Sequence, residues 1–248
     1  MNHERESREG PIMPEVACEP PTMVTARWEQ TDLYRFFARV LAPPSRAWFE
    51  FLARPSSAAE LQELGRYLGS EGGVPAFTWF ATFELYESAY IRLFDVGLPE
   101  PVVPLFESAH DKTHPAQDIA LENSCFYEVL GLKSDPRVGV PDYLITQLEF
   151  LAALTFTLEN ASEPATRASL SLAKAEFLQR HLLNWVPTAA AKLRKTQAPG
   201  FPSLMNLLVR FLQREHAAAV RVSAVEPGER VSVHHASPFP TEATPLRG

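Results

Sequence analysis

The chain has 248 residues and a formal charge of −7, from 23 Lys and Arg against 30 Asp and Glu. This acidic balance argues against nucleic acid as the main partner, because binding to phosphates needs a basic surface. With 46% hydrophobic and 10% aromatic residues, the chain is expected to be globular. No apolar run approaches the roughly 20 residues that span a bilayer, so stable membrane insertion is not expected.

The helices are predicted from apolar patterns and proline positions, taken in chain order. The first carries an apolar face of Leu33, Phe36, Phe37, Val40 and Leu41 and ends at Pro43-Pro44. Proline-free stretches with helical patterns follow at 56–74, 76–98, 116–135, 142–163, 165–186 and 203–226. Ser57 to Glu60 form a capping-box pattern that would open the first of these. Strand patterns are nearly absent.

These patterns predict an all-α, single-domain helical bundle over residues 27–221. Residues 1–26 and 222–248 are rich in Pro, Ser, Glu and small residues, and we expect them to be disordered tails. Cys18 and Cys125 lie far apart and form no Cys-x-x-Cys, which favours a reducing compartment. The charged N-terminus does not resemble a secretory signal. We therefore expect a cytoplasmic protein.

Motifs of enzymes are missing from the sequence. The glycine-rich segment 69–73 lacks the Lys-Ser/Thr of a phosphate-binding loop and reads as a turn. His110 and His114 have the spacing of one helix face, but the prolines around them indicate a loop rather than a metal site. His181 falls on an apolar stripe and is predicted to be a core histidine. No catalytic residue, metal ligand or cofactor is predicted.

Cys125 aligns with Leu121 and Val129 on one face of the helix predicted within 116–135. Because a thiol on an apolar helical stripe is usually packed inside, we predict that Cys125 is buried and inert.

Residues 139–154 are the most informative stretch. Pro141 suits the first turn of a helix, and Asp142 suits the positive end of the helix dipole. Asp142, Thr146 and Glu149 are then predicted to share one polar stripe, beside a separate apolar stripe that faces a core. The residues alone also fit an amphipathic helix with a solvated face.

Residues 93–110 form a second candidate segment, a long loop with three prolines and several apolar side chains. Loops of this length are often functional, although a stiff connector that plugs the core is the alternative. Glu107 and Ser108 near its end are placed to cap or clamp a partner.

The two segments carry a family resemblance. Leu93-Phe94, Gly97 and Pro-Leu-Phe-Glu-Ser at 104–108 resemble the first motif of the TorD/DmsD/NarJ-type chaperones, which mature molybdenum enzymes of the dimethyl-sulfoxide-reductase class. Tyr127, Gly131-Leu132 and residues 141–151 together resemble a second motif, and residues 177–185 resemble a third. The motifs occur in the family's order, and the match runs from about Leu33 to Phe211.

The resemblance implies a TorD-like fold and a dedicated, non-catalytic chaperone. Its partner would be the apo catalytic subunit of a molybdoenzyme, held by its body, its twin-arginine leader or both until the molybdenum cofactor is inserted, and kept from premature export or degradation. The 99–108 loop and the start of the 141 helix would form one wall of a groove for the apolar part of the leader. The predicted binding residues are Pro104, Phe106, Glu107, Ser108, Pro141, Asp142, Tyr143, Gln147 and Glu149. Among them, Asp142, Glu149 and Glu107 would pair with the arginines.

The sequence also departs from the family pattern. The usual Asp-His is Asp142-Tyr143 here, and the following Glu is Gln147. Because Tyr does not titrate near neutral pH as His does, a role for this position in pH-dependent binding is not expected.

Two other functional classes stay open. One is a helical adaptor that binds a different client. The other is a GTP-binding or GTP-hydrolysing protein, since GTP binding has been attributed to some relatives, but the sequence supplies no phosphate cradle. The identity and export of the client are open, and the protein is expected to be a monomer or a homodimer.

Overall fold

The computed structural model describes residues 29–69, 78–97, 100–132 and 140–225. Its elements in chain order are α1 (Gln30–Val40), α2 (Arg46–Leu52), α3 (Pro55–Tyr67), α4 (Phe83–Tyr90), the π-helical η1 (Ile91–Asp95), the 3₁₀-helical η2 (Glu107–Ala109), α5 (Ala116–Glu128), α6 (Leu144–Asn160), α7 (Pro164–Phe177), the π-helical η3 (Leu178–Leu182), α8 (Val186–Arg194) and α9 (Phe201–Val225). The extended pairing among these residues is an isolated antiparallel bridge between Phe106 and Tyr143. The predicted all-α class is confirmed.

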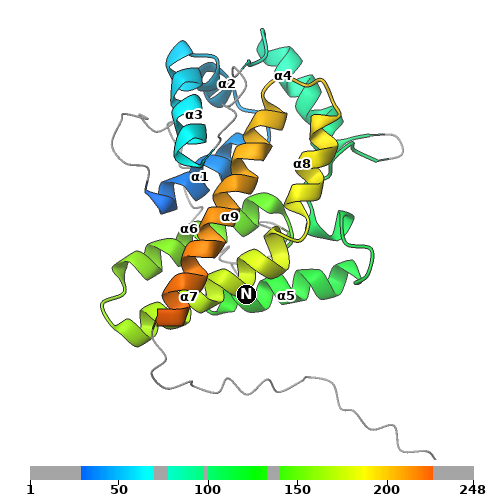
Figure 1. Ribbon diagram of the computed structural model, residues 1–248. Coiled ribbons are helices and arrows are strands. Elements are labelled where there is room, and N and C mark those ends of the chain that lie inside the picture. The colour runs from blue at the N-terminus through cyan, green and yellow to red at the C-terminus, as the bar shows by residue number, and fades with distance from the viewer. Residues whose placement is uncertain (1–28, 70–77, 98–99, 133–139, 226–248) are drawn as a thin grey trace, which may run out of the picture.

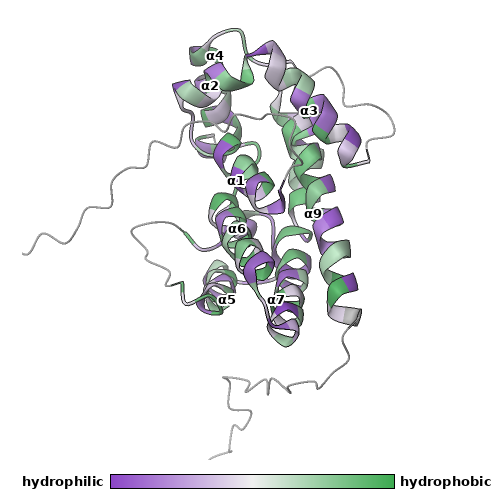
Figure 2. Cartoon of the chain, turned by 90° about the vertical axis from the view of Figure 1, so that its left-hand side faces the viewer, coloured by the Kyte–Doolittle hydropathy of each residue, from purple (hydrophilic) through white to green (hydrophobic). Residues whose placement is uncertain are grey.

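The long helix α9 connects the two ends of the molecule. In Figure 1 it runs from the end that carries α2, α3 and α4 toward the end that carries α5, α6 and α7, with α8 alongside. Turned by 90°, the molecule shows α1 and α6 stacked beside α9 (Figure 2). The most extensive helix contacts are α1 with α6, α7 with α9, and α8 with α9. None of the helices in the described ranges is long and apolar enough to cross a membrane.

Aromatic side chains fill the core along α9. The ring of Phe211 lies 4.6 Å from that of Tyr34 and 5.7 Å from that of Phe37, which fixes α1 against α9. At the start of α9, Phe201 contacts the rings of Trp79, Tyr86, Tyr90 and Phe94. Such pairs add about 0.5–1.5 kcal/mol each beyond the area they bury. The core therefore holds the first and last helices together.

Gly200 allows this aromatic cluster to close. Its φ of +73° is the left-handed conformation that glycine adopts without strain. A Cβ at this position would lie 2.2 Å from Cε3 of Trp79. The residue before α9 must therefore be small as well as conformationally free.

A buried ion pair lies where α7 meets α9. Nζ of Lys174 donates to Oε2 of Glu215 at 2.6 Å, and both side chains are almost fully buried. The Lys174 ammonium also lies 5.2 Å from the ring centre of Tyr34 on α1. Burial raises the pKa of Tyr34 well above its usual value, and the nearby Glu215 carboxylate raises it further. This pair links three helices that the aromatic core also joins.

Two boundaries and one helix differ from the sequence prediction. Helix α3 begins at Pro55 with Arg54 as its N-cap, so Ser57 is not a cap; its hydroxyl donates to the Phe51 carbonyl. Helix α2 was not predicted, although the Ser45 hydroxyl caps it. Helix α9 falls in the predicted 203–226 stretch but continues to Val225, beyond the domain boundary predicted at residue 221. Residues 1–26 and 226–248 lie outside the described residues, as do Cys18 and residues 70–73 of the glycine-rich segment.

The prediction of a buried Cys125 is wrong, because the thiol is exposed on α5. Leu121 and Val129, which share its face, are 64% and 57% exposed. The buried side chains of this helix are instead Ile119, Asn123 and Tyr127. Asn123 and Tyr127 face inward because their polar groups have hydrogen-bond partners there, as described below.

Candidate functional site

The structure brings the two candidate segments together, as the sequence predicted. Phe106 pairs with Tyr143 in the antiparallel bridge. The Glu107 N–H donates to the Asp142 carbonyl at 3.0 Å, and the Leu144 N–H donates to the Leu105 carbonyl at 2.9 Å. This second bond satisfies one of the amide groups that the first turn of a helix leaves unpaired. The 104–108 loop thus fixes the point at which α6 begins.

The predicted helix start at Pro141 is wrong, because α6 begins at Leu144 and Pro141 and Asp142 lie in the preceding turn. Asp142 is buried, and its Oδ2 accepts from the Ser108 N–H at 3.1 Å. Asp142 therefore holds the loop from inside the protein. It does not lie on the solvent-facing stripe that was predicted to contain both Asp142 and Glu149. Thr146 is half-buried and Glu149 is exposed.

Glu107 is the centre of a buried polar cluster, hereafter the Glu107 cluster, that also contains Asn123, Gln147 and His181. Oε2 of Glu107 accepts from Nε2 of Gln147 at 2.6 Å and from Nδ2 of Asn123 at 3.0 Å. Nδ1 of His181 lies 3.1 Å from Oε1 of Glu107. Since a carboxylate is an acceptor, this contact places the proton of the imidazole on Nδ1.

The four members of the Glu107 cluster come from four elements, η2, α5, α6 and η3. Oδ1 of Asn123 also accepts a hydrogen bond from Nε2 of Gln147 at 3.0 Å. The neighbouring Tyr127 hydroxyl donates to the Pro141 carbonyl. Polar networks in a low-dielectric interior are rigid when they are satisfied and costly when they are broken. The cluster therefore holds the 104–108 loop, α5 and the start of α6 in one arrangement.

Phe106 and Tyr143 are the half-buried members of the pairing, and their rings stack with centres 5.0 Å apart. The Tyr143 hydroxyl is 3.5 Å from that of Tyr90, which itself bonds to the Leu41 carbonyl at 3.0 Å. Burial raises the pKa of Tyr143, and the Asp95 and Glu149 carboxylates raise it further. The hydrogen bond with Tyr90 lowers this pKa but does not outweigh the burial. Tyr143 thus stays neutral at physiological pH.

The remaining predicted residues lie around this pair. Pro104 and Pro141 are half-buried, and the Pro104 carbonyl lies 2.8 Å from Nε2 of His110. His110 is further held by stacking on Trp185 at 4.9 Å. Glu149 is exposed on α6, and its partial desolvation raises the pKa of its carboxyl, while Arg39 opposes this. Of the predicted carboxylates, Glu107 and Asp142 are therefore used inside the protein, and Glu149 is open to solvent.

Asn123, Tyr127 and Tyr90 belong to this arrangement but are not among the predicted site residues, although Tyr127 is the first residue of the second family motif. The available signal was the spacing of Asn123 and Tyr127, which places two hydrogen-bonding side chains on one face of α5. The apolar stripe of Leu121, Cys125 and Val129 on the other face is more conspicuous and predicts the opposite orientation of the helix.

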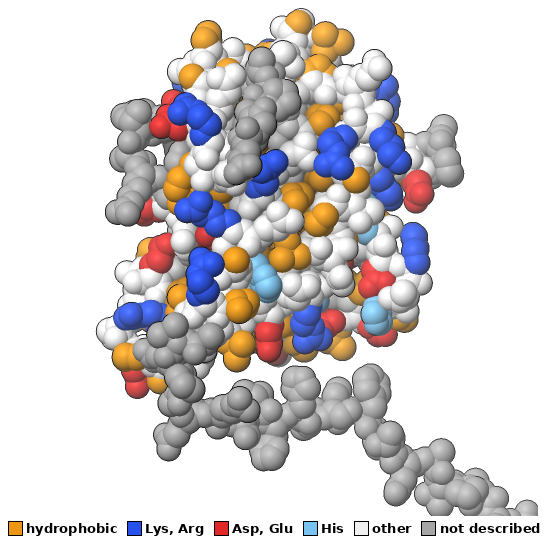
Figure 3. Space-filling model, viewed as in Figure 1, with side chains coloured by type: hydrophobic (Ala, Val, Ile, Leu, Met, Phe, Trp, Pro, Cys, Tyr) orange, Lys and Arg blue, Asp and Glu red, His pale blue; other side chains and the backbone are white. Residues whose placement is uncertain are grey.

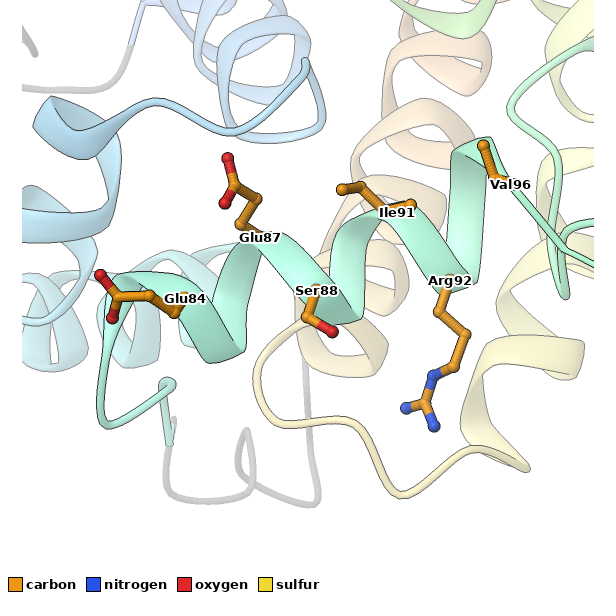
Figure 4. A pocket seen from close by; sticks show the side chains of 6 residues that line it. All are labelled: Glu84, Glu87, Ser88, Ile91, Arg92 and Val96. Atoms are coloured by element: carbon orange, nitrogen blue, oxygen red, sulfur yellow. The ribbon is translucent and has the colours of Figure 1, made fainter.

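A separate hollow of about 360 Å³ lies on the solvent side of α4 and η1. It is lined by Glu84, Glu87, Ser88, Ile91, Arg92 and Val96. Figure 4 shows Glu87 and Arg92 pointing in opposite directions from the helix, so the charged groups do not converge on one ligand position. In the described residues no group of three or more His, Cys, Asp or Glu side chains is arranged to hold a metal.

Comparison with known proteins identifies the family. Curated relatives include assembly chaperone proteins of three reductases. These are the perchlorate reductase protein of Dechloromonas aromatica (30% identity over 58% of this chain and 65% of that protein), the selenate reductase protein of Thauera selenatis (33% over 47% and 62%) and the chlorate reductase protein of Ideonella dechloratans (32% over 46% and 60%). The matched region thus spans less than two thirds of each of these relatives.

A solved structure from Archaeoglobus fulgidus, assigned as a redox enzyme maturation protein, aligns with 78% of this chain and 99% of its own, at 13% identity and a TM-score of 0.47. The family model described as nitrate reductase delta subunit matches residues 54–191, which is more than half of the chain. This range contains the paired 104–108 and 141–144 segments and the whole Glu107 cluster. The protein belongs to the nitrate reductase delta subunit family, to which the TorD/DmsD/NarJ-type resemblance of its motifs also points.

Proposed function

We propose that the protein is a cytoplasmic chaperone for the apo catalytic subunit of a molybdoenzyme of the dimethyl-sulfoxide-reductase class. It would hold the body of the subunit, its leader peptide or both, assist insertion of the molybdenum cofactor, and prevent premature export or degradation. The relatives support this role, since they are named as assembly chaperones of perchlorate, selenate and chlorate reductases. The observation that carries the proposal is the pairing of the 104–108 loop with residues 141–144.

The two segments would contribute in different ways. Phe106 and Tyr143 are half-buried and stacked, and they would offer an aromatic surface to an apolar part of the client. Pro104, Ser108 and Pro141 would shape the edges of this surface. Glu107, Asp142 and Gln147 are buried, so they would act by holding the loop in place rather than by direct contact with the client.

Charge would add orientation to this contact. Glu149 is the exposed carboxylate among the predicted site residues and would pair with an arginine of the client. We assign the contact to Glu149 rather than to a broad acidic surface. Figure 3 shows Lys and Arg side chains interspersed with Asp and Glu on the face that carries α9. Local pairing therefore supports the proposal better than the net charge.

The test is co-purification from the native host, with the tagged full chain and mass spectrometry of the retained proteins. The expected result is one large molybdoenzyme subunit that lacks its cofactor. Phe106→Ser and Glu149→Gln should reduce its recovery several-fold, whereas Glu176→Gln, a matched change of an exposed carboxylate on α7, should not. Recovery of no such subunit by the intact, folded protein would refute the proposed function. Unchanged recovery with both site variants would refute only the placement of the site.

A further inference from the structure

Helices α8 and α9 form a positively charged part of a chain whose total charge is −7. Residues 186–225 contain six exposed Lys and Arg side chains, which are Lys192, Arg194, Lys195, Arg210, Arg214 and Arg221. The one Asp or Glu in this range is Glu215, which is buried and bonded to Lys174. Figure 3 shows Lys and Arg side chains along the course of α9 and over α8. These two helices therefore expose cations without exposing a carboxylate of their own.

Two guanidinium groups of α9 are held in place by uncharged acceptors at the end of α3. Nη1 of Arg210 donates to the Gly69 carbonyl at 3.1 Å, and Nη1 of Arg214 donates to the Tyr67 carbonyl at 2.8 Å. The Arg214 guanidinium also lies 4.2 Å from the centre of the Tyr67 ring. Each hydrogen bond uses one of the five N–H donors of a guanidinium and does not neutralise its charge. Both groups are thus positioned in advance for an anionic partner.

Arg194 adds a third guanidinium to the same row, from α8. Its Nη1 donates to Oδ1 of Asn206 on α9 at 3.1 Å. Asn206, Arg210 and Arg214 are four residues apart, so they share one stripe and follow one another at roughly 6 Å along the helix axis. In the part of the chain that the structure describes, none of the three arginines forms an ion pair. Because like charges at this spacing lower the stability of a helix, the row does not serve α9 itself.

We propose that Arg194, Arg210 and Arg214, hereafter the arginine row, bind an acidic helix of a protein partner along the outer face of α9. A helix with a carboxylate at every fourth residue repeats at the same roughly 6 Å as the arginine row, so successive carboxylates meet successive guanidinium groups. Each guanidinium presents paired N–H donors that fit the two oxygens of a carboxylate. Ala217 is exposed on the same face and lets a second helix approach closely, and the 44% exposed Val220 offers an apolar contact.

The regular spacing of the arginine row favours a polypeptide over a membrane. An anionic bilayer presents the same sign of charge, but its headgroups are mobile and have no fixed repeat. The acidic helix would belong to the body of the client subunit, an assignment that rests on the proposed chaperone function. The arginine row would then give the client a second contact, in addition to the aromatic surface of Phe106 and Tyr143.

Two fluorescently labelled helical peptides test the proposal on the purified full-length chain. Both peptides are rich in alanine and contain the same number of Glu residues. One carries Glu at every fourth position, and the other carries Glu at positions that alternate between opposite faces of the helix. Fluorescence anisotropy at low ionic strength should show that the first peptide binds several-fold more tightly. Its affinity should fall as salt is added, because salt screens exposed charges.

Variants locate the binding surface. Arg194→Gln, Arg210→Gln and Arg214→Gln should each weaken binding of the first peptide by roughly two- to fivefold, as expected for exposed ion pairs. Arg54→Gln is the matched control and should leave binding unchanged. Arg54 is also exposed and lies 5.9 Å from the centre of the Phe51 ring, but it belongs to neither α8 nor α9. The Arg194 bond goes to α9, so Arg194→Gln stays informative even where loss of the Arg210 or Arg214 bond loosens α3.

Three results would overturn the proposal. The first is equal binding of the two peptides, or of the parent and the three variants, since charge alone would then explain the contact. The second is no binding of the first peptide at low ionic strength. The third is binding to phosphatidylglycerol vesicles but to neither peptide, since the face would then belong to a membrane. Because this assay uses the purified chain alone, its failure would leave the chaperone proposal standing, and a co-purification without a molybdoenzyme subunit would leave the arginine row standing.

Discussion

The aromatic core along α9 and the Glu107 cluster both join distant parts of the chain, but by different physical means. Around Phe201 and Phe211, apolar rings from α1, α4 and α9 pack without directional constraints. Around Glu107, a carboxylate, two amides and an imidazole meet through bonds of 2.6 to 3.1 Å. Packing tolerates substitutions that conserve volume, whereas a hydrogen-bonded network requires the right donor or acceptor at each atom. The core supplies stability, and the cluster sets the geometry of the candidate site.

Replacing Glu107 should cause the largest loss in the free energy of unfolding. Glu107→Ala removes the buried carboxylate that accepts from Asn123 and Gln147 and faces His181, and we expect a loss of about 3–5 kcal/mol in the free energy of unfolding. Glu107→Gln conserves volume but turns an amide N–H₂ toward these donors, which should cost about 1–3 kcal/mol. Urea denaturation followed by circular dichroism measures both values.

Leu208→Met, at a fully buried position in the core, is the matched comparison, and its cost should stay below about 1.5 kcal/mol. If Glu107→Gln proves as well tolerated as Leu208→Met, the contrast between the two regions is wrong.

Gly200→Ala tests where the core does depend on geometry. The new Cβ would require a positive φ and would overlap the Trp79 ring. We expect a loss of about 2–3 kcal/mol, from backbone strain together with overpacking. Gly69, whose φ is also positive but which has open space around its Cβ position, is the control. Gly69→Ala should cost only the backbone term, about 1–2 kcal/mol. Equal melting temperatures of the two variants would rule out the steric contribution of Trp79.

Tyr143→Phe should have a smaller effect. It removes a hydroxyl whose contact with Tyr90 is long, at 3.5 Å, and keeps the ring stacked on Phe106. The free energy of unfolding should fall by about 0.5–1 kcal/mol. Because burial raises the pKa of this hydroxyl, the loss should not vary between pH 5 and pH 8. A loss confined to one end of that range, measured by denaturation at several pH values, would contradict this assignment.

Glu149→Gln should have the smallest effect, and its sign depends on pH. Partial desolvation raises the pKa of Glu149 in the folded state, so the ionised carboxylate lowers stability at neutral pH. The variant should therefore be slightly more stable than the parent at pH 7. The difference should disappear as the pH falls below the unfolded-state value, where the carboxyl is protonated in both states. Thermal melts of the two proteins between pH 4 and pH 7 would show a constant difference if this explanation were wrong.

The contrast between the two regions also explains what the sequence could predict. The face of Leu33, Phe36 and Phe37 was recognised because helical periodicity of large apolar side chains reports burial directly. The meeting of the 104–108 loop with the start of α6 followed from the family motifs. The orientation of α5 and the start of α6 could not be predicted in this way. Each depends on hydrogen bonds between residues far apart in sequence, such as Asn123 to Glu107 and Ser108 to Asp142, which leave no periodic signal.

The position of α1 has a consequence for how the protein folds. It packs against α6, and its rings contact Phe211 of α9. One hydrogen bond joins Thr31 to Glu159, 128 residues further along the chain. During synthesis, Tyr34 and Phe37 therefore lack their contacts with Phe211 until α9 has been made. Contacts of such long sequence separation slow folding and expose apolar surface to aggregation meanwhile. Chains truncated before Phe211 should therefore fail to pack around α1.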